Sequence, residues 1–479
     1  MFGAVLWLGG PAWADGRAAD ELPTPSVWAG YETLRLPNGE TMGWLGGELL
    51  FDGDGDGGWQ IGPAVYGAAA GQRGGLFVGG LSLRRRWALG NGWGASAGLF
   101  AGAGGGAGAP VGSGLVLRPS LSVLKALGPT LDAGLSWSWV DFSSGDIRSS
   151  QVGLTLAWHP EHGQDNGEPP DAAPAAPLGQ LQATAGVYTP AGDSGRHLGR
   201  HVGLVGARVT PTAGGGRWGI EAETAGSGGA AGYMAIFGTL DLAAPVGVMG
   251  PGGRVGLRLG AGLGGGGAVP TGGGLIAKAA FFAQAEPWPG WTLGAAWGQA
   301  QGVDGPWHAG LAQAWLGIAL GSPRAAAPGD HPSEIEVSMA LRHHAQVQRR
   351  DGARLGLDTV GLKLDASLGE HLYATGEAHS AYAGRAGAFG IGLVGLGWAG
   401  NRDTPGLRTG IELTAGAAGG GGVDAGGGAV VQAMAWASWA GPARGRWRVG
   451  LGRLEAARGG LAGNVVELAW TRAWSLSGR

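Results

Sequence analysis

Residues 131–139 read LDAGLSWSW, and an apolar side chain occupies every second position from Leu131 to Trp139. A period of two is the spacing of one face of a β-strand, whereas a helix repeats every 3.6 residues. The same alternation occurs in residues 115–123 and 254–263. Turn signals such as PNG (37–39) separate segments of about ten residues, so the sequence predicts an all-β, antiparallel chain.

Glycine-rich runs recur along the chain and reveal an internal repeat. The first of these runs is LFAGAGGGAGAPVGSGLVL (99–117), and similar runs occur at 257–277 and 412–431. Each run is followed by alternating apolar segments and then by a closing segment that contains tryptophan. Glycine permits positive φ and close strand approach, so each run is predicted to be a hairpin. The predicted organisation is unit 1 (26–158), a Pro/Ala-rich linker (159–178), unit 2 (179–320), a second linker (321–332) and unit 3 (333–474).

Each unit contains about eight such segments, which gives about 24 strands in all. An even number of strands returns the chain to the same side, so both linkers lie on one side. Two arrangements remain open: one barrel of about 24 strands, or three eight-stranded barrels in tandem. The linkers and repeated closing segments favour three barrels, whereas growth by duplication favours one.

The face opposite the apolar one distinguishes a membrane barrel from a soluble sandwich. That face is mostly Gly, Ala and Ser, and only 14% of all residues are charged, against roughly 25% in typical soluble domains. A transmembrane barrel turns its apolar face to lipid and its small, polar face to the lumen, with tryptophans at strand ends. Tryptophans occupy such ends at Trp87, Trp93, Trp158, Trp288, Trp291, Trp439 and Trp474. The pattern predicts an up-and-down transmembrane β-barrel.

The closing segment of unit 1 resembles a known signal. Gln151, Gly153, Leu154, Leu156 and Trp158 resemble the C-terminal β-signal of bacterial outer-membrane meander barrels, although the chain's own end runs five residues beyond its last tryptophan. The resemblance implies the bacterial outer membrane, reached through the periplasm. It also implies contact with the lipid bilayer and the outer-membrane insertion machinery, and a plug or periplasmic protein as a further partner.

The N-terminus and the composition narrow the class of protein further. Residues 1–14 end in Ala12-Trp13-Ala14 after a short apolar run, which predicts a signal peptide without its basic start. Cysteine is absent, which excludes disulfides and cysteine-ligated metals. With a formal net charge of −3, the chain has no excess of positive charge with which to bind nucleic acid.

Two motifs suggest chemistry, and each has a structural explanation. Gly260, Gly262 and Gly265 fit GxGxxG, but no helix signal follows and glycine is abundant. Asp52 begins DGDGDG, but its twelfth position is Pro63 rather than glutamate, so a solvated turn is favoured over a weak cation site. We therefore expect no catalytic, cofactor-binding or metal-binding residues, and no enzymatic activity.

Polar residues on the predicted lumen face form the remaining candidates. The third unit is rich in them, and a lumenal polar network is favoured there over a hydrolase site, since GxSxG and HExxH are absent. The expected lumen-lining residues are Arg118, Arg254, Arg258, Lys363, Asp365, Glu377 and His379. The leading functional hypothesis is a pore or a transport or secretion conduit. The alternative is three filled barrels with a structural, anchoring or adhesive role.

Overall fold

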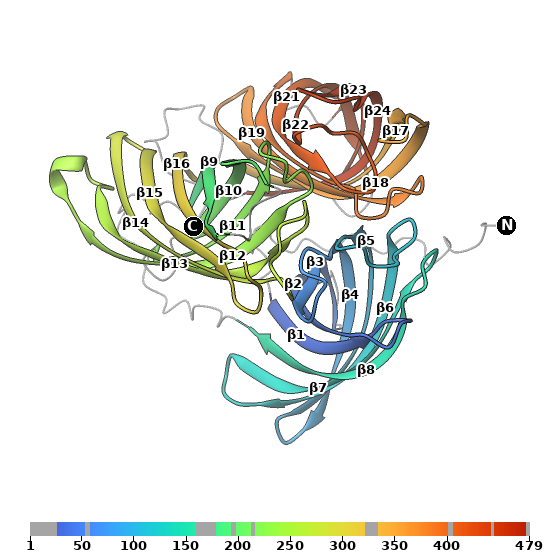
Figure 1. Cartoon of the computed structure of the whole chain (residues 1–479). Coiled ribbons are helices and arrows are strands. Elements are labelled where there is room, and N and C mark those ends of the chain that lie inside the picture. The colour runs from blue at the N-terminus through green and yellow to red at the C-terminus, as the bar shows by residue number, and fades with distance from the viewer. Residues whose placement is uncertain are drawn as a thin grey trace.

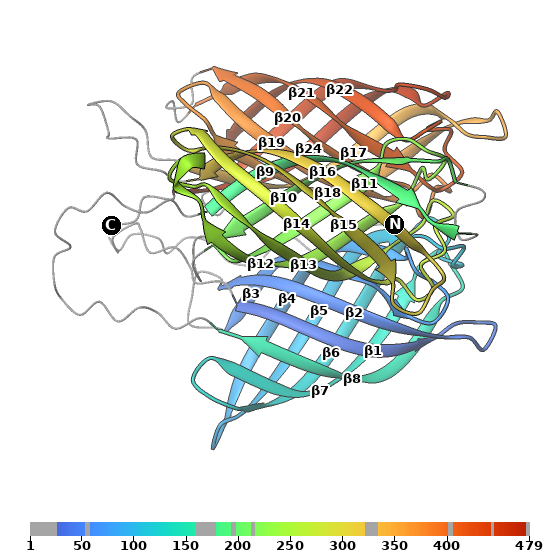
Figure 2. The same ribbon diagram turned by 60° about the vertical axis from the view of Figure 1, so that its left-hand side comes forward.

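The computed structural model describes residues 26–52, 58–159, 179–192, 198–211, 216–320, 334–400, 406–441 and 445–475. These residues form three closed antiparallel barrels of eight strands each, arranged around a common centre (Figure 1). Figure 2 shows the barrels side by side, with strands inclined to the barrel axes. Of the two arrangements that the sequence leaves open, the chain adopts three small barrels.

The strands follow one another around each barrel in chain order. Barrel 1 contains β1 (Ser26–Arg35), β2 (Thr41–Asp52), β3 (Trp59–Ala70), β4 (Phe77–Gly90), β5 (Trp93–Gly105), β6 (Leu115–Ala126), β7 (Leu131–Phe142) and β8 (Arg148–Trp158). Barrel 2 contains β9 (Gly179–Pro190), β10 (Val202–Pro211), β11 (Trp218–Ala225), β12 (Met234–Pro245), β13 (Arg254–Gly265), β14 (Leu275–Trp288), β15 (Trp291–Gly302) and β16 (His308–Leu320). Barrel 3 contains β17 (Glu334–Gln348), β18 (Arg354–Ser367), β19 (Leu372–Ala383), β20 (Gly390–Gly400), β21 (Arg408–Gly419), β22 (Ala429–Ala440), β23 (Arg446–Ala456) and β24 (Ala462–Ser475).

Each barrel closes by pairing its last strand with its own first strand. Val27 pairs with Trp158 in barrel 1, and Leu341 pairs with Leu468 in barrel 3. In barrel 2 the closing pair joins β9 and β16. Because β8 pairs with β1 rather than with β9, the chain does not continue into one wide sheet.

The alternation read from the sequence separates a buried inner face from an exposed apolar outer face. In β8, Gln151 is buried, whereas Val152 and Leu154 on the opposite face are 65% and 63% exposed. Exposed Leu, Val, Ile and Trp side chains continue around all three barrels. A surface this apolar matches hydrocarbon rather than water. Among the residues that the structure describes, no helix is long and apolar enough to cross a membrane.

The two ends of the molecule differ. We call the end at which the first strand of each barrel begins the entry end, and the opposite end the glycine end. Most exposed tryptophans lie at the entry end, where they form an aromatic girdle of the kind found at membrane–water interfaces, while Trp137, Trp139 and Trp297 lie farther along their strands. This girdle consists of Trp59, Trp87, Trp93, Trp158, Trp218, Trp288, Trp291, Trp398 and Trp439.

The three glycine-rich runs are hairpins at the glycine end, and their tips fold back into their own barrels. Val111, Val269 and Val423, one from each tip, are buried in the apolar cluster that fills this end of each lumen. In barrel 1 the cluster includes Leu34 and Phe142, which are fully buried. Each lumen is therefore covered at the glycine end by apolar side chains.

Several predicted segments lie outside the described residues. These are the signal peptide at residues 1–14, the linker at 321–332, and the linker at 159–178 except for His159. The predicted strand-end residue Trp474 lies in β24, but its side chain also falls outside the description.

Candidate functional site: the barrel interiors and the space between them

The lumen of barrel 1 is crossed by two buried ion pairs that share a tyrosine. Arg118 on β6 donates to Glu32 on β1, with Nε 2.8 Å from Oε1. Arg84 on β4 donates to Glu48 on β2, with Nη2 3.0 Å from Oε2. Tyr66 on β3 links the pairs, because its hydroxyl donates to Glu48 and accepts a bond of 3.1 Å from Arg118. The network spans the barrel from wall to wall.

Barrel 2 contains a larger set of buried charges. Asp241 on β12 lies between two arginines: Arg258 Nε is 2.8 Å from its Oδ1, and Arg208 Nη2 is 3.1 Å from the same oxygen. Lys278 on β14 lies between two glutamates of β11, with Nζ 2.8 Å from Glu221 and 3.2 Å from Glu223. All of these side chains are at most 3% exposed.

Barrel 3 contains the most densely connected network. Arg342 on β17 donates to Glu377 on β19 and to Glu467 on β24, each at 2.5 Å. Arg448 on β23 continues from Glu467, at 3.0 Å, to Glu412 on β21, at 2.8 Å. Lys363 pairs with the same Glu412. The network thus contacts strands on opposite sides of the barrel.

Opposite charges nearly balance within each lumen. Barrel 1 places two arginines against two glutamates, and barrel 2 places three cations against three carboxylates. Barrel 3 places three cations against four carboxylates, and His379 lies 3.7 Å from Glu377. A buried charge without a partner carries a desolvation penalty of several kcal/mol, so these networks depend on all of their members.

The lumen of barrel 3 contains a small cavity beside its ionic network. At its entry end a cavity of about 20 Å³ lies among Glu336, Tyr373, Arg408 and Trp436. A single water needs about 10–15 Å³ of such space, so this cavity has room for one or two waters. Together with the apolar cluster at the glycine end, the network obstructs the lumen at two levels.

Most of the residues selected from the sequence lie within these networks. Arg118, Arg258, Lys363, Asp365, Glu377 and His379 are all at most 7% exposed, and all have inward-facing side chains. Arg254 differs, because it lies at the start of β13, is only partly buried, and donates to the carbonyl of Gly216 at 3.3 Å. It lies at the entry mouth of barrel 2 rather than within the network.

The sequence reading missed many partners of the selected residues. The missed members are Glu32, Glu48, Arg84, Arg208, Glu221, Glu223, Asp241, Lys278, Arg342, Glu412, Arg448 and Glu467. The signal was present, since each occupies the small and polar face of an alternating segment. Applying the alternation to every charged residue would have found them.

The motifs that suggest other chemistry are structural parts of the barrels or are only partly described. Gly260, Gly262 and Gly265 lie along β13, which is a strand rather than a loop before a helix. Asp52 accepts a hydrogen bond of 2.9 Å from the side chain of Gln60, while the rest of the DGDG turn lies outside the described residues. Within the described part of the chain, no group of three His, Asp or Glu side chains could hold a metal ion.

The glycine runs also form the seams between neighbouring barrels. A Cβ at Gly114 would come within 2.4 Å of the carbonyl oxygen of Ala381 in barrel 3. The equivalent positions repeat this approach: Gly274 faces Ala68 of barrel 1 at 2.6 Å, and Gly428 faces Ala225 of barrel 2 at 2.5 Å. At each seam the glycine run of one barrel therefore packs backbone to backbone against the hairpin that joins the third and fourth strands of another.

The three seams close a ring. Barrel 1 contacts barrel 2, barrel 2 contacts barrel 3 and barrel 3 contacts barrel 1, each through the same pair of unlike surfaces. Backbone hydrogen bonds join two of the seams, from Gly74 N to Gly272 O at 2.9 Å and from Ala429 N to Gly226 O at 3.1 Å. Heterologous contacts that close after three steps are the geometry of a cyclic trimer, here built within one chain.

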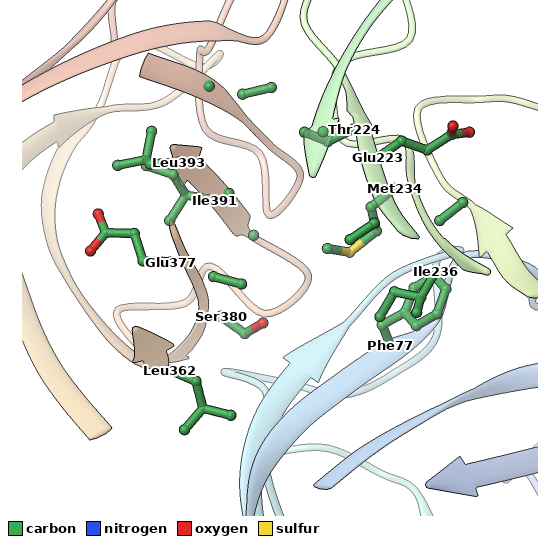
Figure 3. A pocket seen from close by; sticks show the side chains of 18 of the residues that line it. Phe77, Glu223, Thr224, Met234, Ile236, Leu362, Glu377, Ser380, Ile391 and Leu393 are labelled. Carbon is green, nitrogen blue, oxygen red and sulfur yellow. The ribbon is translucent and has the colours of Figure 1, made fainter. Parts of the chain in front are cut away.

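A cavity of about 1050 Å³ lies between the barrels and is lined by residues from all three. Figure 3 shows Phe77 of barrel 1, Met234 and Ile236 of barrel 2, and Leu362 of barrel 3 around this space. The carboxylates of Glu377 and Glu223 point away from it, toward their own barrels. The space between the barrels is therefore apolar, whereas the lumens are ionic.

Of the comparisons with known proteins, the one with solved structures finds similar chains. No protein-family model matches the sequence, and neither does any curated protein. Among solved structures, OccK1 (OpdK) of Pseudomonas aeruginosa is 12% identical, with a TM-score of 0.23, over 94% of this chain and 98% of that one. The FrpB iron transporter of Neisseria meningitidis is 9% identical, with a TM-score of 0.28, over 95% of this chain and 82% of that one. A BenF-like porin from Pseudomonas fluorescens is 10% identical, with a TM-score of 0.24, over 95% and 98%. The fold assignment rests on the strand pairing described above.

Proposed function

We propose that this chain is a bacterial outer-membrane protein whose three filled barrels form one non-enzymatic structural or anchoring unit. The observation that carries the proposal is the double obstruction of each lumen, by a buried ionic network and by an apolar cluster at the glycine end. Eight-stranded barrels are just wide enough for side chains to fill their interior. Such lumens offer no continuous path for ions.

Fusion into one chain supports a role as a rigid unit. Separate barrels would form the three seams only at sufficient concentration, whereas linkers hold the partners at high effective concentration. The ring presents a broad apolar belt to lipid and an aromatic girdle at the entry end, both suited to firm embedding in a bilayer. The insertion machinery and a periplasmic protein remain partners that we expect.

Transport is the second candidate, and one observation favours it. The apolar cavity of about 1050 Å³ between the barrels has the size of a ligand site, which is typically about 300–1,000 Å³. A conduit built on it would carry an apolar molecule between the barrels rather than ions through a lumen.

Planar-bilayer conductance of the full chain tests the proposal. We expect no steps from the unmodified protein. As a control, Glu32→Ala, Arg118→Ala and Val111→Gly together weaken both obstructions in barrel 1, because they remove one of its two ion pairs and the valine of its hairpin tip, and they should produce small steps. Nanosiemens steps from the unmodified chain would contradict the proposal and support a pore.

A further inference from the structure

The cavity between the barrels runs from the glycine end toward the entry end. All three glycine runs line it at one end, through Gly106, Gly267 and Gly421. Asp52 at the end of β2 and Arg472 near the end of β24 line it at the other. Its length therefore follows the strands, which span the bilayer.

The seams enclose the cavity at the glycine end. The close backbone approaches between barrels involve the glycine runs and the hairpins that face them, such as Gly105 against Ala388 and Gly419 against Gly232. These contacts draw the barrels together at the end where the first strand of each barrel finishes. The barrels therefore make close backbone contacts at the glycine end, which favours filling of the cavity from the entry end.

The walls of the cavity are chemically continuous with the surface that faces lipid. Leu49 and Ile61 of barrel 1 line the cavity and are 39% and 48% exposed. Val209, Met339 and Leu364 extend the apolar wall onto barrels 2 and 3. Water gains few hydrogen bonds in such a space, and apolar cavities of this kind stay dry. An empty space would cost free energy through lost contacts, so hydrocarbon is the filling that matches the walls.

We propose that the cavity binds the acyl chains of a phospholipid from the leaflet at the entry end. Arg472 places a positive charge at that mouth, which matches the phosphate of a phospholipid head group. The acyl chains then extend between the barrels toward the glycine ring. The inference goes beyond the proposed function, because a bound lipid is compatible with either a structural unit or a conduit.

Native mass spectrometry of the full chain tests this site directly. The protein is stripped of lipid in mild detergent and titrated with phosphatidylethanolamine. Ala222→Trp with Ala378→Trp fills the cavity from barrels 2 and 3, where both alanines are exposed on its wall. Ala295→Trp with Ala312→Trp adds the same volume to the outer face of barrel 2, away from the cavity.

The cavity-filling variant should retain the lipid at least about tenfold less than the unmodified chain and the control variant, which should behave alike. Arg472→Gln is a second variant that leaves the cavity volume intact, and it should weaken retention of the same lipid. Equal retention by all four proteins would overturn the proposal. Preferential binding of lipopolysaccharide over phosphatidylethanolamine would contradict a phospholipid as the occupant of the cavity. Heat-modifiable gel migration confirms that each variant is folded, and conductance tests the proposed function separately.

Discussion

The inside of each barrel and the space between the barrels use the two faces of the same strands in opposite ways. On β18, Lys363 faces a lumen and pairs with Glu412, while its neighbour Leu362 faces the central cavity. The inner faces are joined by charge pairs, and the outer faces meet apolar surroundings. The difference shows that a charged residue on the inner face is stabilised by its ion partners, whereas an apolar residue on the outer face is stabilised by an apolar environment.

Removing one member of a lumenal network should have the largest effect. Arg342→Ala leaves Glu377 and Glu467 buried without their shared cation, which should lower the free energy of unfolding by about 3–5 kcal/mol. Urea unfolding in lipid vesicles measures the change. Arg453→Ala is the matched control, since its partner is Glu455 and both side chains are at least half exposed, and it should cost less than about 1 kcal/mol. Similar losses for both variants would contradict the importance of burial.

Placing a charge on the outer face should have the next largest effect. Leu154, on the outer face of β8, is 63% exposed. If this face meets hydrocarbon, Leu154→Arg should lower the free energy of unfolding by about 2–4 kcal/mol. Leu127 is matched in exposure, at 64%, but lies beyond the end of β6 at the entry end. Leu127→Arg should therefore lower the free energy of unfolding by only about 0–1 kcal/mol, the cost near the membrane interface. The same urea titration compares the two, and equal, small costs would argue that water covers both positions.

Widening a seam should have a smaller and more local effect. A Cβ at Gly265 would lie 2.5 Å from the carbonyl carbon of Gly74. Gly265→Val should therefore overpack this seam and lower the free energy of unfolding by about 1–3 kcal/mol. The barrels should stay folded while barrels 1 and 2 move apart. The chain has no cysteine, so spin labels at Val152→Cys and Leu293→Cys can report their separation. Gly47→Val, where a Cβ meets nothing within 4 Å, should leave that distance unchanged.

A charge pair outside the bilayer should have the smallest effect. Arg73 donates hydrogen bonds from Nε and Nη2 to the carboxylate of Glu40 at the glycine end, and they hold the pKa of Glu40 below its usual range. The pair should add at most about 1 kcal/mol above the unfolded-state pKa, near 4.5, and this contribution should fade as the pH falls through the lowered value. Glu40→Gln should remove that part of the acid dependence in urea titrations at several pH values. An unchanged acid profile would show that the pair contributes nothing.

Much of the fold could be predicted from local pattern, and less of the site could be. Alternation predicted strands, and the recurrence of the glycine-rich runs at 99–117, 257–277 and 412–431 predicted three units. The same alternation placed Arg118 and Glu377 on the lumen face, but the ion partners of a residue depend on strands far away in sequence. Arg254 shows the limit, since the inner face extends beyond the network to the barrel mouth.

The sequence by itself determined the strands, their two faces and the threefold repeat, because these depend on side-chain spacing along a short stretch of chain. Only the tertiary structure decided that each unit closes on itself, because either closure satisfies the same alternation. It also decided the role of the glycine runs. Their composition shows that the backbone can approach something closely, but the carbonyls of Ala381, Ala68 and Ala225 that they meet belong to distant segments. Contacts of that kind arise only when three barrels form one ring.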